Sequence, residues 1–230
     1  MNKEKIFDLI DGLFAREIMN DDDLQLLAEL SKNEEAIIRV EAAKLLARSN
    51  YESSRDILIH LCGDSDELVR VNACDSLCVF PNEKTYEALK KCLREDESPL
   101  VKAYALLSVI DIMRDISVDE QILKDLFLTA MEKETAIGIK SACAKGLYLL
   151  GGKEYLVHML NGLSQEEYTD RCAAVHALVS ILNEENFETI KSALLELYAK
   201  EKTEAVQFTI ENALEQMDEF IRSDSSLRSE

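Results

Sequence analysis

Cysteine and histidine are the residues of this 230-residue sequence whose spacing can first be tested for chemistry. Cys74 and Cys78 are separated by one helical turn, and His60 and Cys62 precede them. A zinc site could be built from these four side chains, because thiolates and imidazoles are the usual zinc ligands. Their spacing matches no common ligand pattern, however, and the sequence has no CxxC pair. We therefore predict no metal site and interpret the cysteines as buried, reduced thiols within apolar helix patterns.

The three histidines, His60, His158 and His176, do not indicate an active site. None has a Ser or Cys nucleophile with an orienting acid at a recognisable spacing, as nucleophilic catalysis requires. The sequence has no Gly-rich pattern of the kind that binds phosphate. Gly151 and Gly152 are instead predicted to form a turn between helices. We therefore predict half-buried or surface imidazoles, no cofactor and no catalytic function.

The sequence is strongly acidic. It has 45 Asp and Glu residues against 26 Lys and Arg, a formal net charge of −19. Such a charge repels phosphate backbones, so we expect no nucleic acid ligand, whereas a basic protein would be attracted. The alternative is an acidic surface that only interacts with solvent. No apolar run approaches the roughly 20 residues that span a bilayer, and the N-terminus does not resemble a signal peptide. We therefore expect a cytoplasmic protein that does not bind membranes.

The elements that carry these side chains form an internal repeat. Six segments share a polar anchor residue with apolar residues one position before it and three and seven positions after it, which is one face of an α-helix. The anchors are Arg39, Arg70, Lys102, Lys140, Arg171 and Gln207. In the fifth repeat Asp170 stands where an aliphatic residue is expected. Either the helix begins later there, or Asp170 faces outward.

Each anchored segment is predicted to be the second helix of a pair. These second helices cover residues 36–47, 67–78, 99–110, 138–149, 169–180 and 205–216. An amphipathic first helix precedes each of them, over residues 21–32, 51–62, 83–95, 119–133, 153–163 and 186–200. Helix pairs that recur every ~30–40 residues predict an all-α solenoid of about six pairs.

The anchored pattern of an aliphatic residue, Arg or Lys, Ala and Leu resembles the second helix of HEAT repeats. It is most similar to the short bacterial-type HEAT-like repeats of phycocyanobilin lyase subunits. The resemblance extends from about residue 21 to about residue 221, and it implies an α-α superhelix whose second helices line a concave side. Tetratricopeptide and ankyrin repeats have similar periods, but their signature residues are absent.

The resemblance also implies a ladder of polar contacts along the turns. In the family, an acid or amide six residues before the anchor often binds backbone amides or the neighbouring basic residue. The corresponding residues here are Asn33, Asp64, Asp96, Glu134, Gln165 and Glu201. The same position would also suit a helix N-cap. Pro99, at the start of the third second helix, fits the preference of proline for a first turn.

Some HEAT-like proteins are enzymes, but their signatures are missing from this sequence. Deoxyhypusine hydroxylases carry His-Glu motifs as iron ligands, and this sequence has no His-Glu dipeptide. Alkylpurine DNA glycosylases use a basic concave face with Trp residues, whereas this chain is acidic and has no Trp. A bilin-lyase-like enzyme subunit is the alternative function that remains.

Both ends of the stack are predicted to be capped. Residues 3–19 are expected to form an extra amphipathic helix before the first repeat. In the last repeat, Glu211 and Glu215 replace the apolar residues of the other repeats, as a terminal repeat requires, since nothing stacks beyond it. An acidic stripe that binds a basic partner is the alternative. We predict a single repeat domain over residues 1–222 and a flexible tail over residues 223–230.

The predicted binding surface consists of second-helix side chains that point away from the core. These are Glu41, Lys44, Asn72, Asp75, Tyr104, Leu107, Asp111, Lys145, His176 and Asn212. A mixed polar strip with Tyr104 and Leu107 at its centre is typical of protein recognition, and a plain solvated groove is the alternative. We therefore predict a non-catalytic protein-binding scaffold or adaptor. One form of this hypothesis is an acidic inhibitor, or immunity-type protein, for a basic partner such as a nuclease.

Overall fold

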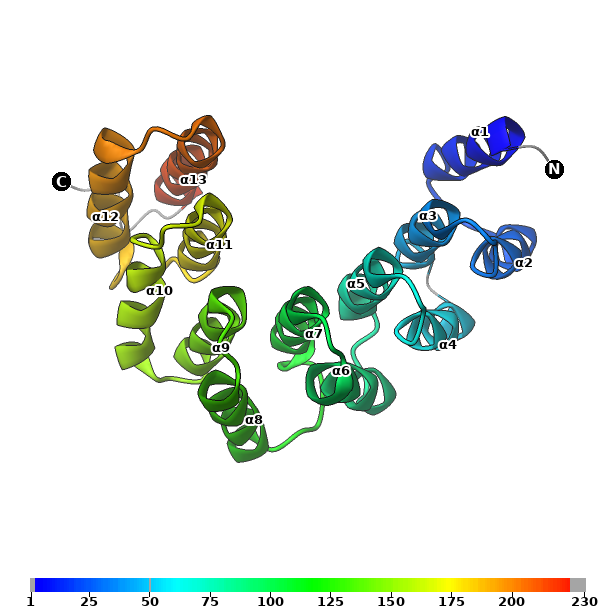
Figure 1. Ribbon diagram of the computed structural model, residues 1–230, viewed down its shortest axis with the longest axis horizontal. Coiled ribbons are helices and arrows are strands. Elements are labelled where there is room, and N and C mark those ends of the chain that lie inside the picture. Colours follow the sequence, from blue (N-terminus) through cyan, green and yellow to red (C-terminus); the bar gives the residue numbers. More distant parts are fainter. Residues whose placement is uncertain (1–2, 50, 224–230) are drawn as a thin grey trace. The chain divides into compact units, whose positions relative to one another are not determined.

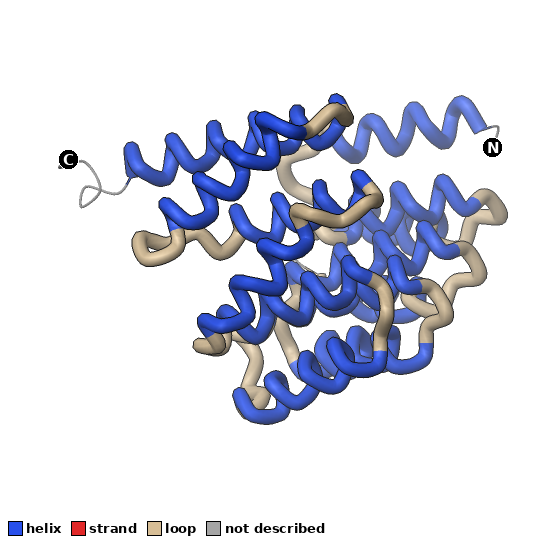
Figure 2. The backbone as a smooth tube through the Cα atoms, turned by 60° about the vertical axis from the view of Figure 1, so that its left-hand side comes forward, coloured by secondary structure: helices blue, strands red, loops and turns tan. Residues whose placement is uncertain are grey.

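The computed structural model describes residues 3–49 and 51–223. These residues fold into thirteen α-helices and two short 3-10 helices, with no strand among them (Figures 1 and 2). The all-α prediction and its six helix pairs with one extra helix are thereby confirmed. The chain divides into two compact units, residues 1–119 and 120–230, and each is described by itself. A single domain over residues 1–222 stays a prediction, and residues 224–230 of the predicted tail lie outside the described residues.

The N-terminal unit has two layers of helices. Its elements are α1 (Lys3–Phe14), α2 (Asp21–Leu30), α3 (Ala36–Leu46), α4 (Glu52–Leu61), α5 (Glu67–Ser76), η1 (Leu77–Val79), α6 (Glu83–Glu95) and α7 (Pro99–Ile112). The second helices α3, α5 and α7 pack against one another, and the first helices α2, α4 and α6 form the other layer (Figure 1). One face of the unit is therefore lined by second helices, and the opposite face by first helices.

Helix α1 covers the start of this unit but is shorter than predicted. It packs against α3 and buries Ile6, Ile10 and Leu13, as expected of a capping helix. It ends at Phe14 instead of Met19. The following residues leave the helix because Asn20 begins α2 as an N-cap, in a reciprocal capping box with Asp23.

The C-terminal unit repeats the same plan. Its elements are α8 (Glu120–Lys133), α9 (Ile137–Leu149), η2 (Lys153–Tyr155), α10 (Leu156–Gly162), α11 (Tyr168–Val179), α12 (Phe187–Lys200) and α13 (Glu204–Ser223). Helix α11 packs against both α9 and α13, and α10 packs against α9 and α11. Gly151 has a φ of 94° in the turn after α9, which only glycine adopts without strain. The predicted turn at Gly151 and Gly152 is confirmed.

Every second helix begins at the same distance from its anchor. The first helical residues are Ala36, Glu67, Pro99, Ile137, Tyr168 and Glu204. The residue three positions after each anchor is fully buried, which includes Cys143 and Ile210 as well as four alanines. Helix α11 therefore does not begin late, and Asp170 occupies the usual register as a half-buried residue in its first turn.

The ladder implied by the family resemblance occurs in both units. The Nε and Nη2 atoms of Arg39 donate to the carboxylate of Asp64 at 2.8 and 2.7 Å. Its Nη1 atom donates to the carbonyl oxygen of Asn33, in the turn of its own repeat, at 2.7 Å. The equivalent pairs are Arg70 with Asp96 and Arg171 with Glu201. Each of these arginines thus joins the turns of two successive repeats.

The prediction that the ladder acids cap the second helices is wrong. Asp64 and Asp96 lie two residues before the N-caps, and their carboxylates accept from the backbone N–H of Asp66 and Ser98 at 2.8 Å. Asp66 and Ser98 are themselves the N-caps, and their side-chain oxygens accept from the first N–H groups of α5 and α7. The ladder acid folds the turn, and the residue two positions later caps the helix.

The last repeat presents an acidic face, as the sequence predicts. Glu211 and Glu215 of α13 are exposed. The corresponding residues of α11, Val175 and Val179, are buried and half-buried. The hydroxyl of Tyr198 donates to Glu211 at 2.6 Å, so this end of the unit carries polar contacts instead of an apolar row.

Candidate functional site

The predicted binding residues of the N-terminal unit lie on α3, α5 and α7, which pack side by side. Lys44, Asp75 and Asp111 are exposed, and the others are half-buried; those are Glu41, Asn72, Tyr104 and Leu107. Three of these side chains already make contacts within their own helix. Lys44 forms an ion pair with Glu41 at 2.8 Å, and the amide of Asn72 donates to the carbonyl oxygen of Leu68 at 2.7 Å.

Two carboxylates on this face influence each other. Partial desolvation of its carboxyl raises the pKa of Asp75 above its ordinary value, and the negative charge of Asp111 on α7 raises it further. Burial raises the pKa of the Cys78 thiol to about 11, again with a contribution from Asp111 and Asp75. Neither Asp75 nor Asp111 has an ion-pair partner among the described residues. Within the described residues, this part of the face therefore carries two carboxylates without an ion pair.

Tyr104 and Leu107 lie on α7 beside this acidic pair and are half-buried. The residues behind them, such as Leu106 and Ser108, are fully buried. The Ser108 hydroxyl donates to the carbonyl oxygen of Cys74 at 2.8 Å, which fastens α7 to α5. The surface thus stands on a rigid layer of packed helices, a condition for a preorganised binding site.

The other three predicted binding residues belong to the C-terminal unit. Lys145 lies on α9, His176 on α11 and Asn212 on α13, and these helices form one row. His176 is exposed, and the other two are half-buried. Their role as a binding surface stays a prediction.

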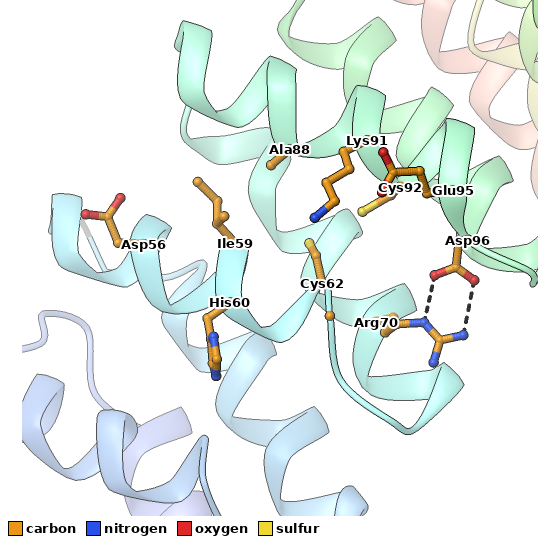
Figure 3. A pocket seen from close by; sticks show the side chains of 11 residues that line it. Asp56, Ile59, His60, Cys62, Arg70, Ala88, Lys91, Cys92, Glu95 and Asp96 are labelled. Atoms are coloured by element: carbon orange, nitrogen blue, oxygen red, sulfur yellow. Dashed lines mark hydrogen bonds and ion pairs between the residues drawn. The ribbon is translucent and has the colours of Figure 1, made fainter.

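A pocket of about 620 Å³ lies in the N-terminal unit. It is lined by Asp56, Ile59, His60, Cys62, Gly63, Arg70, Ala88, Lys91, Cys92, Glu95 and Asp96 (Figure 3). The ion pair between Arg70 and Asp96 stands at one end of the pocket, and His60 at another (Figure 3). Most of these residues come from α4 and α6, so the pocket opens between two neighbouring first helices.

Three thiols meet beside this pocket. They belong to Cys62 at the C-cap of α4, Cys74 on α5 and Cys92 on α6. All three Sγ atoms lie within 4.8 Å of one another, and those of Cys62 and Cys74 are 3.9 Å apart. The side chains of Cys62 and Cys92 also line the pocket, whereas Cys74 is fully buried beneath it.

The thiols of this cluster do not titrate alike. Hydrogen bonds from Cys62 and Cys74 lower the pKa of Cys92 below its ordinary value, although burial opposes this, and the nearby charge of Lys91 contributes in the same direction. Hydrogen bonding to its two neighbours and burial raise the pKa of Cys74 well above its ordinary value. Cys92 is therefore the member of the cluster that ionises first, and it faces the pocket.

The four side chains considered above as zinc ligands, His60, Cys62, Cys74 and Cys78, do not lie together in the structure. It brings Cys62 and Cys74 together, but it places Cys78 beside Asp75 and Asp111, and His60 points away from the sulfurs (Figure 3). Cys92 is not part of the spacing pattern of Cys74, Cys78, His60 and Cys62. The repeat pattern could have indicated that Cys92 lies near Cys62, because both residues lie near the C-terminal ends of successive first helices.

The three histidines lie at the surface, as predicted, whereas two of the six cysteines predicted to be buried are only half-buried. His60, His158 and His176 are all exposed, and His158 stacks on Tyr155 with ring centroids 5.8 Å apart. All six cysteines are free; Cys62, Cys74, Cys92 and Cys143 are buried, while Cys78 and Cys172 are half-buried. No helix among the described residues is long and apolar enough to cross a membrane.

Comparison with known proteins agrees with this geometry. Residues 24–110 match the family model for HEAT repeats. The chain is similar in structure to the complex of CpcE and CpcF of phycocyanin lyase from Nostoc sp., with a TM-score of 0.57, 16% identity, and coverage of 87% of this chain and 83% of that chain. The Escherichia coli protein YibA has a TM-score of 0.54 and 16% identity, with 97% of this chain and 80% of that one covered. No curated protein matches the sequence.

Residues 24–110 are HEAT repeats, and beyond them the likeness to solved structures shows the fold alone. The family match lies in the N-terminal unit, which also holds the acidic face and the thiol cluster. The HEAT-like register makes the cluster unusual. The buried positions of the preceding repeat that correspond to Cys62, Cys74 and Cys92 are Ser31, Ala43 and Leu61. Stacking of these repeats therefore does not require sulfur at any of the three positions.

Proposed function

We propose that this HEAT-like protein is a non-catalytic protein-binding scaffold whose ligand surface is formed by the second helices. The observation that carries the proposal is the face of α3, α5 and α7. Partly exposed side chains there, with Tyr104 and Leu107 among them, stand on a fully buried layer. Aromatic and aliphatic anchors within a polar surround are typical of protein recognition.

The charge of this face supports a basic partner. Asp75 and Asp111 repel each other, and an Arg or Lys side chain placed between them would relieve that repulsion. The net charge of −19 would also speed the capture of a cationic protein. An inhibitor, or immunity-type protein, for a basic target is one form of this proposal. Six free cysteines are in keeping with a cytoplasmic location, where thiols stay reduced.

The first experiment is capture of partners by the full chain, followed by mass spectrometry and by a measurement of affinity. We expect a basic protein whose binding weakens as salt is raised, because screening reduces attraction between unlike charges. A copurifying chromophore or lyase subunit would instead support a bilin-lyase-like role. That alternative derives from the sequence pattern, and the similarity to the complex of CpcE and CpcF shows the fold alone.

Variants then locate the surface. Tyr104→Ala combined with Asp111→Lys should weaken partner binding by about tenfold or more, since both change the proposed contact face. Glu29→Lys is the matched control, because it makes the same change of charge on α2, in the other layer of the same unit. Glu29 and Asp111 are both exposed and both lie in the last turn of a helix. Equal affinities for the double variant and the unaltered chain would reject the second-helix surface.

A further inference from the structure

We infer that Cys62, Cys74 and Cys92 form a binding site for a thiophilic metal ion, with zinc(II) as the expected ligand. Three sulfur atoms from three different helices converge at one point of the N-terminal unit. Such convergence is what a metal site demands, because the ion must be reached by several ligand atoms at once.

The spacing of the sulfur atoms fits a zinc ion. Thiolates bound to zinc at about 2.3 Å in a tetrahedron lie about 3.8 Å apart. The Sγ atoms of Cys62 and Cys74 are 3.9 Å apart, and no pair in the cluster exceeds 4.8 Å. Rotation of one side chain that closes the widest separation by about 1 Å would complete a three-thiolate site.

The surroundings supply both charge and access. A zinc ion with three thiolates carries one net negative charge, and Lys91 lines the pocket beside Cys92 and would compensate it. Cys62 and Cys92 reach the pocket wall while Cys74 lies beneath them. The fourth coordination position would therefore face the pocket, where a water molecule or an added ligand could occupy it.

Packing alone is the competing explanation, since cysteine is a common small buried hydrophobe. Two observations favour a site. The preceding repeat has Ser31, Ala43 and Leu61 at the equivalent buried positions, so the fold does not need sulfur there. A cysteine chosen only for packing also has no reason to line a pocket, yet two of these three do.

Titration of the reduced full chain with cobalt(II), which replaces zinc spectroscopically, tests the inference. We expect thiolate-to-cobalt charge-transfer absorption and the intense visible bands of a tetrahedral site, both abolished by one equivalent of zinc. Cys92→Ser should reduce the affinity by more than about 100-fold, because it removes a direct ligand. Cys143→Ser is the control, since Cys143 is an equally buried cysteine of the C-terminal unit whose pKa is raised to about 12 by burial. It should bind cobalt as the unaltered chain does.

A second measurement on the unaltered chain keeps the test decisive if Cys92→Ser does not fold. Bound zinc should protect Cys62 and Cys92 from alkylation and leave Cys78 and Cys172 as reactive as before. The inference is overturned if the reduced chain takes up neither cobalt nor zinc, or if zinc leaves the alkylation of Cys62 and Cys92 unchanged. A chain that purifies with a disulfide in the cluster and binds no metal after reduction would also overturn it. None of these readouts depends on the proposed partner.

Discussion

At the scale of single residues, the arginines of the ladder explain why the anchor position is so often basic. The Nε and Nη2 atoms of Arg39 donate to the carboxylate of Asp64 in the next repeat. Its Nη1 atom donates to the carbonyl oxygen of Asn33 in the turn of its own repeat. A lysine has no such planar fork and cannot make this combination of bonds. Gln207, the anchor of the last repeat, keeps only the contact with its own turn, at 2.9 Å from the Glu201 carbonyl oxygen.

The pair of Arg171 and Glu201 gives a prediction about pH. Hydrogen bonds from Arg171 hold the pKa of Glu201 at about 2, below its ordinary value of 4.5, and backbone N–H groups contribute. A lowered pKa stabilises the fold above pH 4.5, and this stabilisation is lost as the pH falls toward about 2. Glu201→Gln should therefore lower the free energy of unfolding by about 2 kcal/mol at neutral pH. The difference should shrink through this acid range, as measured by denaturant unfolding at several pH values.

Glu196→Gln is the control for this measurement. Glu196 lies on the same helix and pairs with Lys200, but their side chains are 71% and 70% exposed. Exposed ion pairs contribute little, because water and salt screen them. The Glu196 variant should therefore change stability much less than the Glu201 variant. Equal losses in the two variants would show that burial of the ladder pair has no energetic importance.

At the scale of helices, close approach is decided by small residues at a few contact points. Helix α9 packs against α8, where the fully buried ring of Phe127 lies over Gly146. A Cβ atom at Gly146 would meet that ring at 2.7 Å, well inside van der Waals contact. The absence of a side chain at Gly146 is therefore what sets the separation of α8 and α9.

Gly146→Ala should destabilise the protein by about 1–3 kcal/mol, because the buried ring has no free space to move into. Gly138→Ala in the same helix is the control, since its Cβ atom would meet nothing within 4 Å. That change should be neutral or stabilise by up to about 1 kcal/mol, because alanine favours a helix over glycine. Urea unfolding of both variants tests this, and a Gly146 variant as stable as the unaltered chain would contradict the assigned contact.

At the scale of the whole molecule, net charge is the dominant property. A charge of −19 repels itself, and this repulsion opposes the compact state. The buried ion pairs of the ladder are screened by salt much less than exposed charges are. Added salt should therefore weaken the repulsion among the acidic residues more than it weakens the attraction within the ladder ion pairs.

We accordingly expect the thermal midpoint to rise as monovalent salt is increased from about 0.01 M to about 0.15 M, over which the screening length shortens from ~30 Å to ~8 Å. The effect should be much smaller near pH 4.6, where the net charge is close to zero. Differential scanning calorimetry at the two pH values measures both. A midpoint that falls with salt at neutral pH would mean that exposed ion pairs outweigh the repulsion.

The helices were predictable from the sequence because their signals are local. The buried face of each second helix repeats at fixed offsets from an anchor such as Arg39, and the second helices begin within one residue of the predicted positions. Among the first helices, α10 begins at Leu156, three residues after its predicted start. The ladder pair of Arg39 and Asp64 was implied by family resemblance. Its acid was misread as a helix cap, because spacing cannot tell a turn residue from the N-cap two positions later.

The candidate sites were predictable only in part, for the same physical reason. The sequence placed Asp75, Tyr104 and Asp111 on helix faces that point away from the core, and all three are at least partly exposed. It could not show that Asp75 and Asp111 influence each other, because that depends on how closely α5 and α7 approach.

Periodicity and composition thus determined an acidic, all-α repeat protein, with its helices and its buried positions. Tertiary structure alone decided which thiols meet. Cys62 ends α4, Cys74 lies on α5 and Cys92 on α6, and their sulfur atoms come within 4.8 Å only because α4 packs against α5 of the other layer and against α6 of its own. Helix formation follows from neighbours along the chain, whereas a site with three ligands depends on distances between segments that no local pattern encodes.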